Sequence, residues 1–172
     1  AQKYRMTEFR LLTAQDVIPL IGLSVAKHQQ EFVASNAVTL AQSLFEPGNE
    51  IYGMWVKNTP LGLIAIIDMG HPNQALEPDD DPNGLLIWRL MVSKDHQGKG
   101  HGRDAMRFAE KRCRELGHGN LLLSAIDHKD SAIAFYEQQG YRKTGRIVDG
   151  EVEMAKALNN PHGEATFSLI DD

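Results

Sequence analysis

Two periods of hydrophobic and polar residues alternate along this chain, and each change of period marks an expected strand or helix. Residues 4–12 alternate with the two-residue period of a strand. Thr13 and Asp16 then form a Ser/Thr-x-x-Asp/Glu helix start. This start precedes apolar residues at helical spacing, namely Val17, Leu20, Ile21 and Val25. The pattern therefore predicts a strand followed by a helix.

A second helix is expected after a cap at Ser35 or Asn36, and the sequence Glu-Pro-Gly-Asn at residues 46–49 should end it. Its predicted apolar face consists of Ala37, Leu40, Ala41, Leu44 and Phe45. Strand patterns at residues 50–58 and 60–70, separated by an Asn-Thr-Pro turn, predict an antiparallel hairpin. Residues 71–84 are rich in Pro, Asp, Asn and Gly and lack periodicity, which indicates a long loop.

The second half of the chain predicts a strand-turn-helix-strand unit, then a short helix and a terminal strand pair. Residues 85–93 form the buried strand, and residues 120–126 form the strand that follows the helix. The helix between them has an apolar stripe of Ala105, Ala109, Cys113 and Leu116. Residues 131–139 predict the short helix, and residues 141–148 pair with 151–158 about an Asp-Gly turn. We therefore expect a mixed α+β domain, whose mostly antiparallel sheet of six to seven strands has helices on both faces.

Composition and charge limit the possible partners. A chain of 172 residues with 42% hydrophobic and 24% charged residues is typical of one globular domain over residues 1–172. The net charge of -5 disfavours nucleic acid, because binding to phosphates needs clustered surplus Lys and Arg. The basic residues between 103 and 114 are interleaved with acidic ones, so we interpret that surface as solvated. An acidic protein suits a cationic partner better.

Targeting signals, disulfides and metal motifs are not expected either. The N-terminus is too polar for a signal peptide, and the longest apolar run is too short to span a bilayer, so we expect a cytoplasmic protein without a membrane partner. Cys113 is the single cysteine and falls among apolar helix positions, which favours a buried, inert thiol. The histidines form no His-Glu-x-x-His motif, and His96 and His101 lack a third ligand nearby, so no metal is expected.

A glycine-rich turn, Gln97-Gly98-Lys99-Gly100-His101-Gly102, lies where the buried strand ends and the helix begins. Glycines let the backbone bend sharply and approach a ligand, and the first amides of a helix have no partner within it. These amides and the helix dipole predict a site for phosphate or pyrophosphate. The dinucleotide motif Gly-x-Gly-x-x-Gly is missed by one residue and Gly-Lys-Ser/Thr is absent, so both nucleotide-binding interpretations are disfavoured.

The spacing of this turn resembles the Gln/Arg-x-x-Gly-x-Gly/Ala signature of the GNAT superfamily of N-acetyltransferases. In that family the signature cradles the pyrophosphate of acetyl-coenzyme A. The preceding strand pairs with the pantetheine arm, here through Leu90, Met91 and Val92. The resemblance implies that these three residues and the whole turn, residues 97–102, bind acetyl-coenzyme A.

A second motif supports the resemblance. The family's Ala-Ile-x-Leu/Phe-Tyr-x-x-x-Gly-Phe/Tyr segment is matched by Ala132, Ile133, Phe135, Tyr136, Gly140 and Tyr141. Family members often carry Asn three residues before this Ala, where the chain has Lys129, which could still reach the cofactor's phosphates. The match is firmest over residues 85–157, the implied cofactor-binding core. Residues 1–84 would form the acceptor side and residues 158–172 a C-terminal tail.

Acetyl transfer to an amine needs a neutral nucleophile, a polarised thioester carbonyl and a proton for the departing thiolate. Tyr136 is similar in position to the family's general-acid tyrosine, and its phenol can donate a proton to the sulfur. The alternative is a core tyrosine on the apolar face of a short helix. A backbone amide of residues 90–92 would hold the carbonyl oxygen, where this strand separates from its neighbour.

The general base and the acceptor are less well defined. Glu31, Asp68 and Asp127 are candidates for binding or deprotonating the amine, and solvated or capping acids are the alternative. Arg89 lies in an apolar strand and is expected to have a carboxylate or phosphate partner. Residues 29–45 and 85–92 resemble bacterial spermine/spermidine acetyltransferases. An acidic run that could attract such a polyamine consists of Glu77, Asp79, Asp80 and Asp81.

Other functions stay open at this point. The acceptor could instead be an aminoglycoside, an amino acid or a peptide N-terminus, or the domain could bind acyl-coenzyme A without catalysis. A homodimer is expected by analogy with the family, with the apolar terminal strand pair as the edge for pairing.

Overall fold

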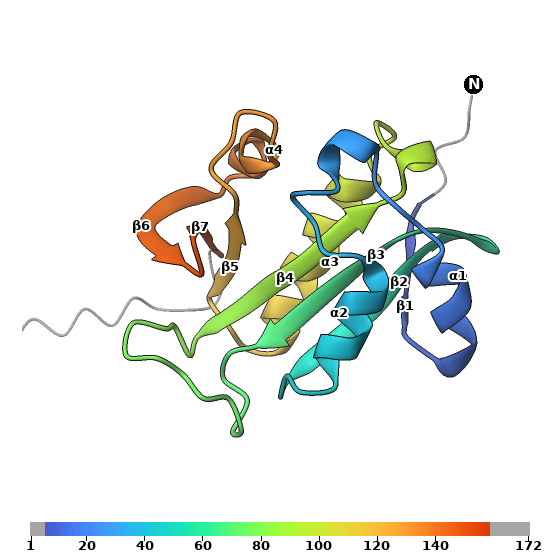
Figure 1. Ribbon diagram of the computed structural model, residues 1–172. Coiled ribbons are helices and arrows are strands. Elements are labelled where there is room, and N and C mark those ends of the chain that lie inside the picture. The colour runs from blue at the N-terminus through green and yellow to red at the C-terminus, as the bar shows by residue number, and fades with distance from the viewer. Residues whose placement is uncertain (1–5, 159–172) are drawn as a thin grey trace, which may run out of the picture.

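The computed structural model describes residues 6–158, which form one sheet with helices on both of its faces (Figure 1). The seven strands of this part are β1 (Glu8–Leu11), β2 (Asn49–Val56), β3 (Thr59–Asp68), β4 (Gly84–Val92), β5 (Asn120–Ala125), β6 (Arg142–Val148) and β7 (Glu151–Ala157). Its α-helices are α1 (Val17–Ile21), α2 (Asn36–Ser43), α3 (His101–Glu115) and α4 (Ile133–Gln138). The expected α+β class is confirmed, and the predicted tail lies outside the described residues from residue 159 on.

The strand order is β1-β2-β3-β4-β5-β7-β6, and neighbouring strands are antiparallel except for the pair of β4 and β5. The two hairpins predicted from the sequence, β2–β3 and β6–β7, are both present. Helix α3 connects the parallel strands β4 and β5, as the strand-turn-helix-strand pattern predicted. This crossover places the glycine-rich turn at the carboxyl end of β4.

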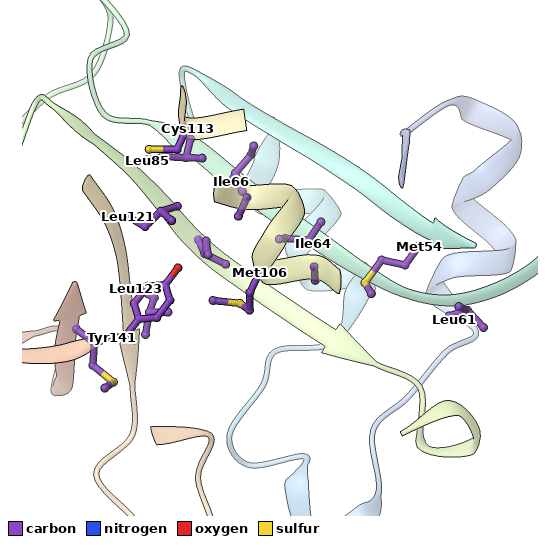
Figure 2. Packing of buried hydrophobic residues seen from close by; sticks show 14 residues of the cluster. Met54, Leu61, Ile64, Ile66, Leu85, Met106, Cys113, Leu121, Leu123 and Tyr141 are labelled. Atoms are coloured by element: carbon purple, nitrogen blue, oxygen red, sulfur yellow. The ribbon is translucent and has the colours of Figure 1, made fainter. Parts of the chain in front are cut away.

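The core has two layers because successive residues of a strand point to opposite faces of the sheet. In β3, Ile64 and Ile66 belong to the cluster beneath α3, whereas Leu63 and Ala65 belong to the cluster beneath the N-terminal segment. Figure 2 shows the first cluster, in which Met106 and Cys113 of α3 face the sheet. Leu20 of α1 is fully buried in the second cluster. The predicted burial of Cys113 is confirmed, and burial raises the pKa of its thiol to about 11.

Strands β4 and β5 pair over only the first four residues of each and then diverge (Figure 1). Residues 84–87 pair with residues 120–123, and the ladder ends there. On the other side of β4, Ile87 pairs with Ile66 and Arg89 with Ala65, so Trp88 is an extra residue that forms a β-bulge. A bulge bends its strand. Residues 88–92 therefore keep a backbone edge toward β5 with no strand paired to it in the described part of the chain.

The predicted apolar face of α2 is wrong except at Leu40, which packs against the second cluster. The helix ends at Ser43, and Leu44 and Phe45 are 81% and 83% exposed. Its buried residues are instead Asn36 and Thr39, and the Asn36 side-chain amide donates a 2.8 Å hydrogen bond to the carbonyl of Leu20. Helical spacing could not reveal this arrangement, because a polar side chain is stable in the interior once it is hydrogen-bonded.

The outer strand of the terminal pair is also less apolar than expected. Arg142, Lys143 and Thr144 of β6 are exposed, and Gly145 adopts a φ of 92° where the register with β7 shifts. Ile147, at 64% exposed, is the large apolar exception. Charges and irregular backbone on an edge strand discourage strand-to-strand association. The homodimer stays a prediction.

Candidate active site

The glycine-rich turn adopts backbone conformations that favour glycine. Gly98 and Gly100 have φ values of 73° and 87°, in the left-handed region, and Gly100 is the N-cap residue of α3. A Cβ on Gly102 would lie 3.4 Å from the ring of Phe135. The turn therefore passes close to α4, and the amides of the first turn of α3 have no partner within the helix, as the predicted anion site requires.

A cavity of about 590 Å³, the turn cavity, lies between β4, the start of α3 and α4. The glycine-rich turn forms its polar end. Its apolar lining consists of Val25, Phe32, Val33, Leu90, Met91, Val92, Ala132 and Phe135. The cavity thus combines the glycine-rich helix start with a long apolar wall.

Eight of the ten residues expected to bind the cofactor line the turn cavity. They are Leu90, Met91, Val92, Gln97, Gly98, Gly100, His101 and Gly102. Lys99 and Lys129 are exposed and do not belong to its lining, although Asp130 and Ser131, which follow Lys129, do. The direct cofactor contacts of all ten residues stay predictions.

Two side chains of the turn have structural partners. The Gln97 amide donates to the carbonyl of Val92 at 3.0 Å and to Oε1 of Gln29 at 2.9 Å, which ties the turn to β4 and to the N-terminal segment. His101 is buried, and its Nδ1 lies 2.8 Å from Oγ1 of Thr7, whose hydroxyl donates to Asp104. Burial lowers the pKa of His101, and the nearby charge of Asp104 opposes this shift. His101 therefore contributes its backbone to the turn, while its imidazole holds the start of α3.

Tyr136 is half-buried on α4, and its side chain lines the turn cavity. Burial raises its pKa to about 12, and the negative charge of Glu151 adds to the shift. Its ring lies against those of Phe135 and Tyr141, with centroids 5.4 and 6.0 Å away. Within residues 6–158 the hydroxyl has no hydrogen-bond partner, so it can donate to a ligand.

A second cavity of about 360 Å³, the side cavity, lies next to the turn cavity. Tyr136, Leu90, Phe32 and Val33 line both cavities. The two cavities therefore meet at Tyr136, beside the stretch of β4 that has left β5. Two ligands entering from the two sides would have their ends adjacent to the phenol.

Arg89 lies in the wall of the side cavity and forms no close ion pair among the described residues, although the charge of the Glu151 carboxylate in the same cavity acts on it. Its guanidinium stacks on Trp88, 4.9 Å from the ring centroid, and donates to the carbonyl of Trp88 and the amide oxygen of Gln42 at 2.7 and 3.0 Å. The Arg89 Nε and Trp88 Nε1 atoms are buried without partners. Burial lowers the pKa of Arg89, against the opposing effect of Glu151.

The three predicted acceptor-site carboxylates have different locations. Glu31 lines the side cavity and is exposed at its rim. Asp68 Oδ1 lies 2.6 Å from Nε2 of His118, and Asp127 Oδ1 lies 3.9 Å from Nζ of Lys143. Neither aspartate lines the turn or the side cavity. Of the three predicted carboxylates, the structure thus brings only Glu31 to the side cavity.

Sequence reasoning missed two polar residues of the side cavity, Ser124 on β5 and Glu151 on β7. The Ser124 hydroxyl donates a 2.5 Å hydrogen bond to Oε2 of Glu151. Alternation along β7, where Val152 and Met154 are buried, could have assigned Glu151 to the opposite face of the strand. No signal in the sequence shows that this face borders Tyr136, because β7 reaches it only through its pairing with β5.

The acidic loop borders a third cavity of about 560 Å³, the loop cavity, which shares Trp88, Arg89, Ser124 and Glu151 with the side cavity. Two of the aspartates are already paired. Asp80 lies 3.1 Å from Arg146, and Asp81 accepts a 2.7 Å hydrogen bond from Asn120. Arg146 also donates to the carbonyl of Asp79 at 2.7 Å. These contacts hold the loop against the sheet and reduce the charge available to a ligand.

The described part of the chain contains neither a metal-binding cluster nor a membrane-spanning helix. Between residues 6 and 158, no group of three His, Cys, Asp or Glu side chains is placed to hold a metal ion. No helix in this range is long and apolar enough to cross a membrane.

Comparisons with solved structures identify the same fold. An acetyltransferase from Thermus thermophilus superposes with a TM-score of 0.63 at 20% identity, over 90% of this chain and 99% of that one. The PaiA N-acetyltransferase from Thermoplasma acidophilum, in complex with coenzyme A, gives a TM-score of 0.64 at 16% identity, over 88% and 99%. At these identities the likeness concerns the fold alone.

Sequence comparisons identify relatives and a family. An uncharacterized N-acetyltransferase from Lactobacillus delbrueckii subsp. lactis is 30% identical over 113 residues, 66% of this chain and 63% of that protein. N-acetyltransferase family 8 member 2 from Rattus norvegicus is 32% identical over 107 residues, 60% of this chain and 43% of that protein. The matched region thus spans less than two thirds of either relative. The model of the acetyltransferase (GNAT) family matches residues 19–141. The chain therefore belongs to the acetyltransferase (GNAT) family.

Proposed function

We propose that the chain transfers the acetyl group of acetyl-coenzyme A to a primary amine. The observation that carries the proposal is that the turn cavity and the side cavity meet at Tyr136. A donor in one cavity and an acceptor in the other would have their reacting atoms held together, which is a large part of catalysis. Membership of the acetyltransferase family supports the same class of reaction.

The turn cavity has the groups that acetyl-coenzyme A requires. The amides at the start of α3, together with Gly98 and Gly100, suit its pyrophosphate. The free backbone edge at residues 88–92 suits the amide groups of the pantetheine arm, which can pair with a strand edge. Lys129 is exposed close to the cavity and could contact a phosphate by charge, without the amide contact of the family's Asn. The bound cofactor would supply an acyl thioester.

Tyr136 is proposed as the general acid. Because burial raises its pKa to about 12, the phenol keeps its proton at neutral pH and can donate it where a thiolate develops. A backbone amide of residues 90–92 is proposed to polarise the carbonyl oxygen, since the amides on the free edge of β4 are not used by β5.

For the acceptor we propose a polyamine such as spermine or spermidine. Glu31 and Glu151 line the side cavity, and the adjoining loop cavity adds the carboxylate of Glu46. Several separated carboxylates attract a ligand with several ammonium groups. One observation favours a second candidate, an amine that also carries a carboxylate, such as an amino acid. Arg89 reaches the side cavity and has no ion pair among the described residues.

The test is a panel of amines with acetyl-coenzyme A, in which release of coenzyme A is measured. The panel contains spermine, spermidine, an aminoglycoside, an amino acid and a peptide with a free N-terminus. We expect the highest kcat/KM with a polyamine and a preference that rises with its length. A preference for the amino acid would select the second candidate. Binding of acetyl-coenzyme A without release by any amine would contradict catalysis and indicate a non-catalytic module.

A further inference from the structure

The side cavity contains a carboxylate that forms no close ion pair with the described residues, although its charge acts on Arg89 in the same cavity. Glu151, the first residue of β7, lines this cavity and is half-buried. Its Oε2 accepts the hydrogen bond from Ser124, and its Oε1 has no hydrogen-bond partner between residues 6 and 158. One oxygen of the carboxylate is thus fixed by the protein while the other is available to a ligand.

The other carboxylates near the sheet are engaged or lie elsewhere. Asp80 and Glu153 both form ion pairs with Arg146, at 3.1 and 3.2 Å. Asp68 is bonded to His118, and Asp127 lies beside Lys143. Glu31 is exposed at the rim of the side cavity, where water screens its charge. Within the side cavity the charge of Glu151 acts on Arg89 without a close ion pair, so Glu151 is the carboxylate best placed to bind an ammonium group there.

Tyr136 and Glu151 lie close enough for the charge of one to affect the other. Both line the side cavity, and the charge of Glu151 contributes to the raised pKa of Tyr136. A proton acceptor and a proton donor on the two sides of a reacting pair are what acyl transfer to an amine requires.

We infer that Glu151 binds the ammonium group of the acceptor and removes its proton, and that Ser124 positions the Glu151 carboxylate. This inference rests on the proposed acetyl transfer and names the base that the sequence left open. Ser124 is a positioning residue, because its hydroxyl contacts the carboxylate rather than the amine.

Glu151 and Tyr136 together carry the protons of the acyl transfer. Glu151 takes one proton from the ammonium, and the nitrogen lone pair then forms the C–N bond at the thioester carbonyl carbon. When the C–S bond breaks, its electron pair stays on sulfur, and Tyr136 donates the proton that makes the thiol. The second nitrogen proton returns to the Tyr136 phenolate, and Glu151 releases its proton to water. One ammonium and one thioester thus give one amide, one thiol and one proton.

The experiment compares Glu151→Gln with the unchanged protein, using the best amine of the panel at saturating acetyl-coenzyme A. We expect kcat/KM for the amine to fall by about a hundredfold or more, because general base catalysis is worth about 10²–10⁴. Ser124→Ala should lose about tenfold, the value of one hydrogen bond to a charged group. Glu151→Asp, which keeps a shorter carboxylate, should retain more activity than Glu151→Gln. The Kd for acetyl-coenzyme A, measured by calorimetry, should be the same in all of them.

Glu137→Gln is the matched control, since it removes the same charge from an exposed residue of α4 that lines none of the three cavities. It should behave like the unchanged protein. The inference is overturned if Glu151→Gln keeps kcat/KM within about threefold, or if Glu137→Gln loses as much. A parallel loss of acetyl-coenzyme A affinity would also overturn it, because that would indicate a structural role. If the unchanged protein acetylates no amine, acetyl transfer itself fails and the inference falls with it.

Discussion

The two cavities that meet at Tyr136 present different groups to a ligand, mainly backbone groups in the turn cavity and mainly side chains in the side cavity. The turn cavity relies on backbone: left-handed glycines, the first amides of α3 and the free edge of β4, all within residues 88–103. The side cavity relies on side chains from separate segments, including Glu31 before α2, Arg89 on β4 and Glu151 on β7. A site made of consecutive backbone groups requires certain residue types at fixed positions, which can be recognised in the sequence. A site made of side chains from separate segments has no such fixed spacing along the chain.

Because of this difference, we expect the turn cavity to set the affinity for the cofactor and the side cavity to set the choice of amine. Backbone amides at a helix start bind any pyrophosphate of the right size and carry no information about the acceptor. Charged side chains such as Glu31 and Arg89 can vary without disturbing the sheet and can therefore set the choice of amine. Substitutions on the turn side should change the affinity for acetyl-coenzyme A, and substitutions on the other side should change the handling of the amine.

The largest effect is expected at the boundary between the two sides, from Tyr136→Phe. We expect kcat to fall by about 10²–10⁴, because the thiolate loses its proton donor. The Kd for acetyl-coenzyme A should stay within about twofold, since backbone groups, and not the Tyr136 hydroxyl, are proposed to bind the cofactor. Steady-state kinetics and calorimetry measure the two quantities. Tyr141→Phe is the control, because the Tyr141 hydroxyl is buried without a partner and its removal should preserve both. An unchanged kcat in Tyr136→Phe would mean that Tyr136 only packs against its neighbours.

The pH dependence of kcat is a second test of Tyr136 as the general acid. Because burial raises the pKa of Tyr136 to about 12, deprotonation of the acid removes activity only as the pH rises toward that value. The rate should therefore not fall between about pH 8 and about pH 10, where an unperturbed tyrosine begins to lose its proton. A profile of kcat against pH measures this. A decline centred near pH 9 would contradict Tyr136 as the acid.

A smaller effect is expected on the turn side, from Gly100→Val. A side chain at a φ of 87° strains the backbone by about 1–2 kcal/mol and also enters the anion site. The Kd for acetyl-coenzyme A should rise by at least about tenfold, equivalent to about 1.4 kcal/mol, while the KM for the amine changes little. Gly117→Val provides the matched control, since Gly117 has a φ of 78° at the other end of α3 with nothing within 4 Å of an added Cβ. Equal losses of cofactor affinity in the two variants would remove the phosphate assignment.

A several-fold effect is expected on the acceptor side, from Glu31→Gln. Glu31 is chosen over the loop aspartates because Asp80 and Asp81 already bind Arg146 and Asn120. If a polyamine binds through several ammonium groups, its KM should rise about three- to tenfold with little change in kcat, since such a contact is similar in the ground and transition states. Raising the salt concentration should shrink the difference. An unchanged KM for spermidine at low ionic strength would exclude Glu31 from the acceptor site.

The smallest effect, no reaction of the folded protein with a thiol reagent, is expected at Cys113, which lines neither the turn cavity nor the side cavity. The thiol is buried and its pKa is raised to about 11, so the reactive thiolate is scarce at neutral pH. A thiol reagent should leave the folded protein unlabelled and react only after denaturant unfolds it. Mass spectrometry before and after unfolding measures the labelling. Rapid labelling of the folded protein would show that α3 opens from the sheet.

The glycine-rich turn and its place before α3 were predictable from the sequence alone, whereas the side chains of Val25, Phe32 and Val33 that also line the turn cavity were not. Gly98 and Gly100 are recognisable because their left-handed backbone favours a residue without a Cβ, and the spacing to α3 is fixed by the chain itself. Both hairpins and the crossover were also predictable, because alternation and turn residues are local signals. Periodicity misled at α2, where hydrogen-bonded Asn36 is buried while Leu44 and Phe45 are exposed.

Only the tertiary structure decided which side chains surround the acceptor. The bulge at Trp88 separates β4 from β5 and creates the space beside Tyr136. The pairing of β7 with β5 then brings Glu151 to Ser124, across 27 residues of chain, and the ion pairs of Arg146 remove Asp80 from consideration. Residues that meet through strand pairing carry no mutual spacing in the sequence, because the sheet, and not the chain, sets the distance between them.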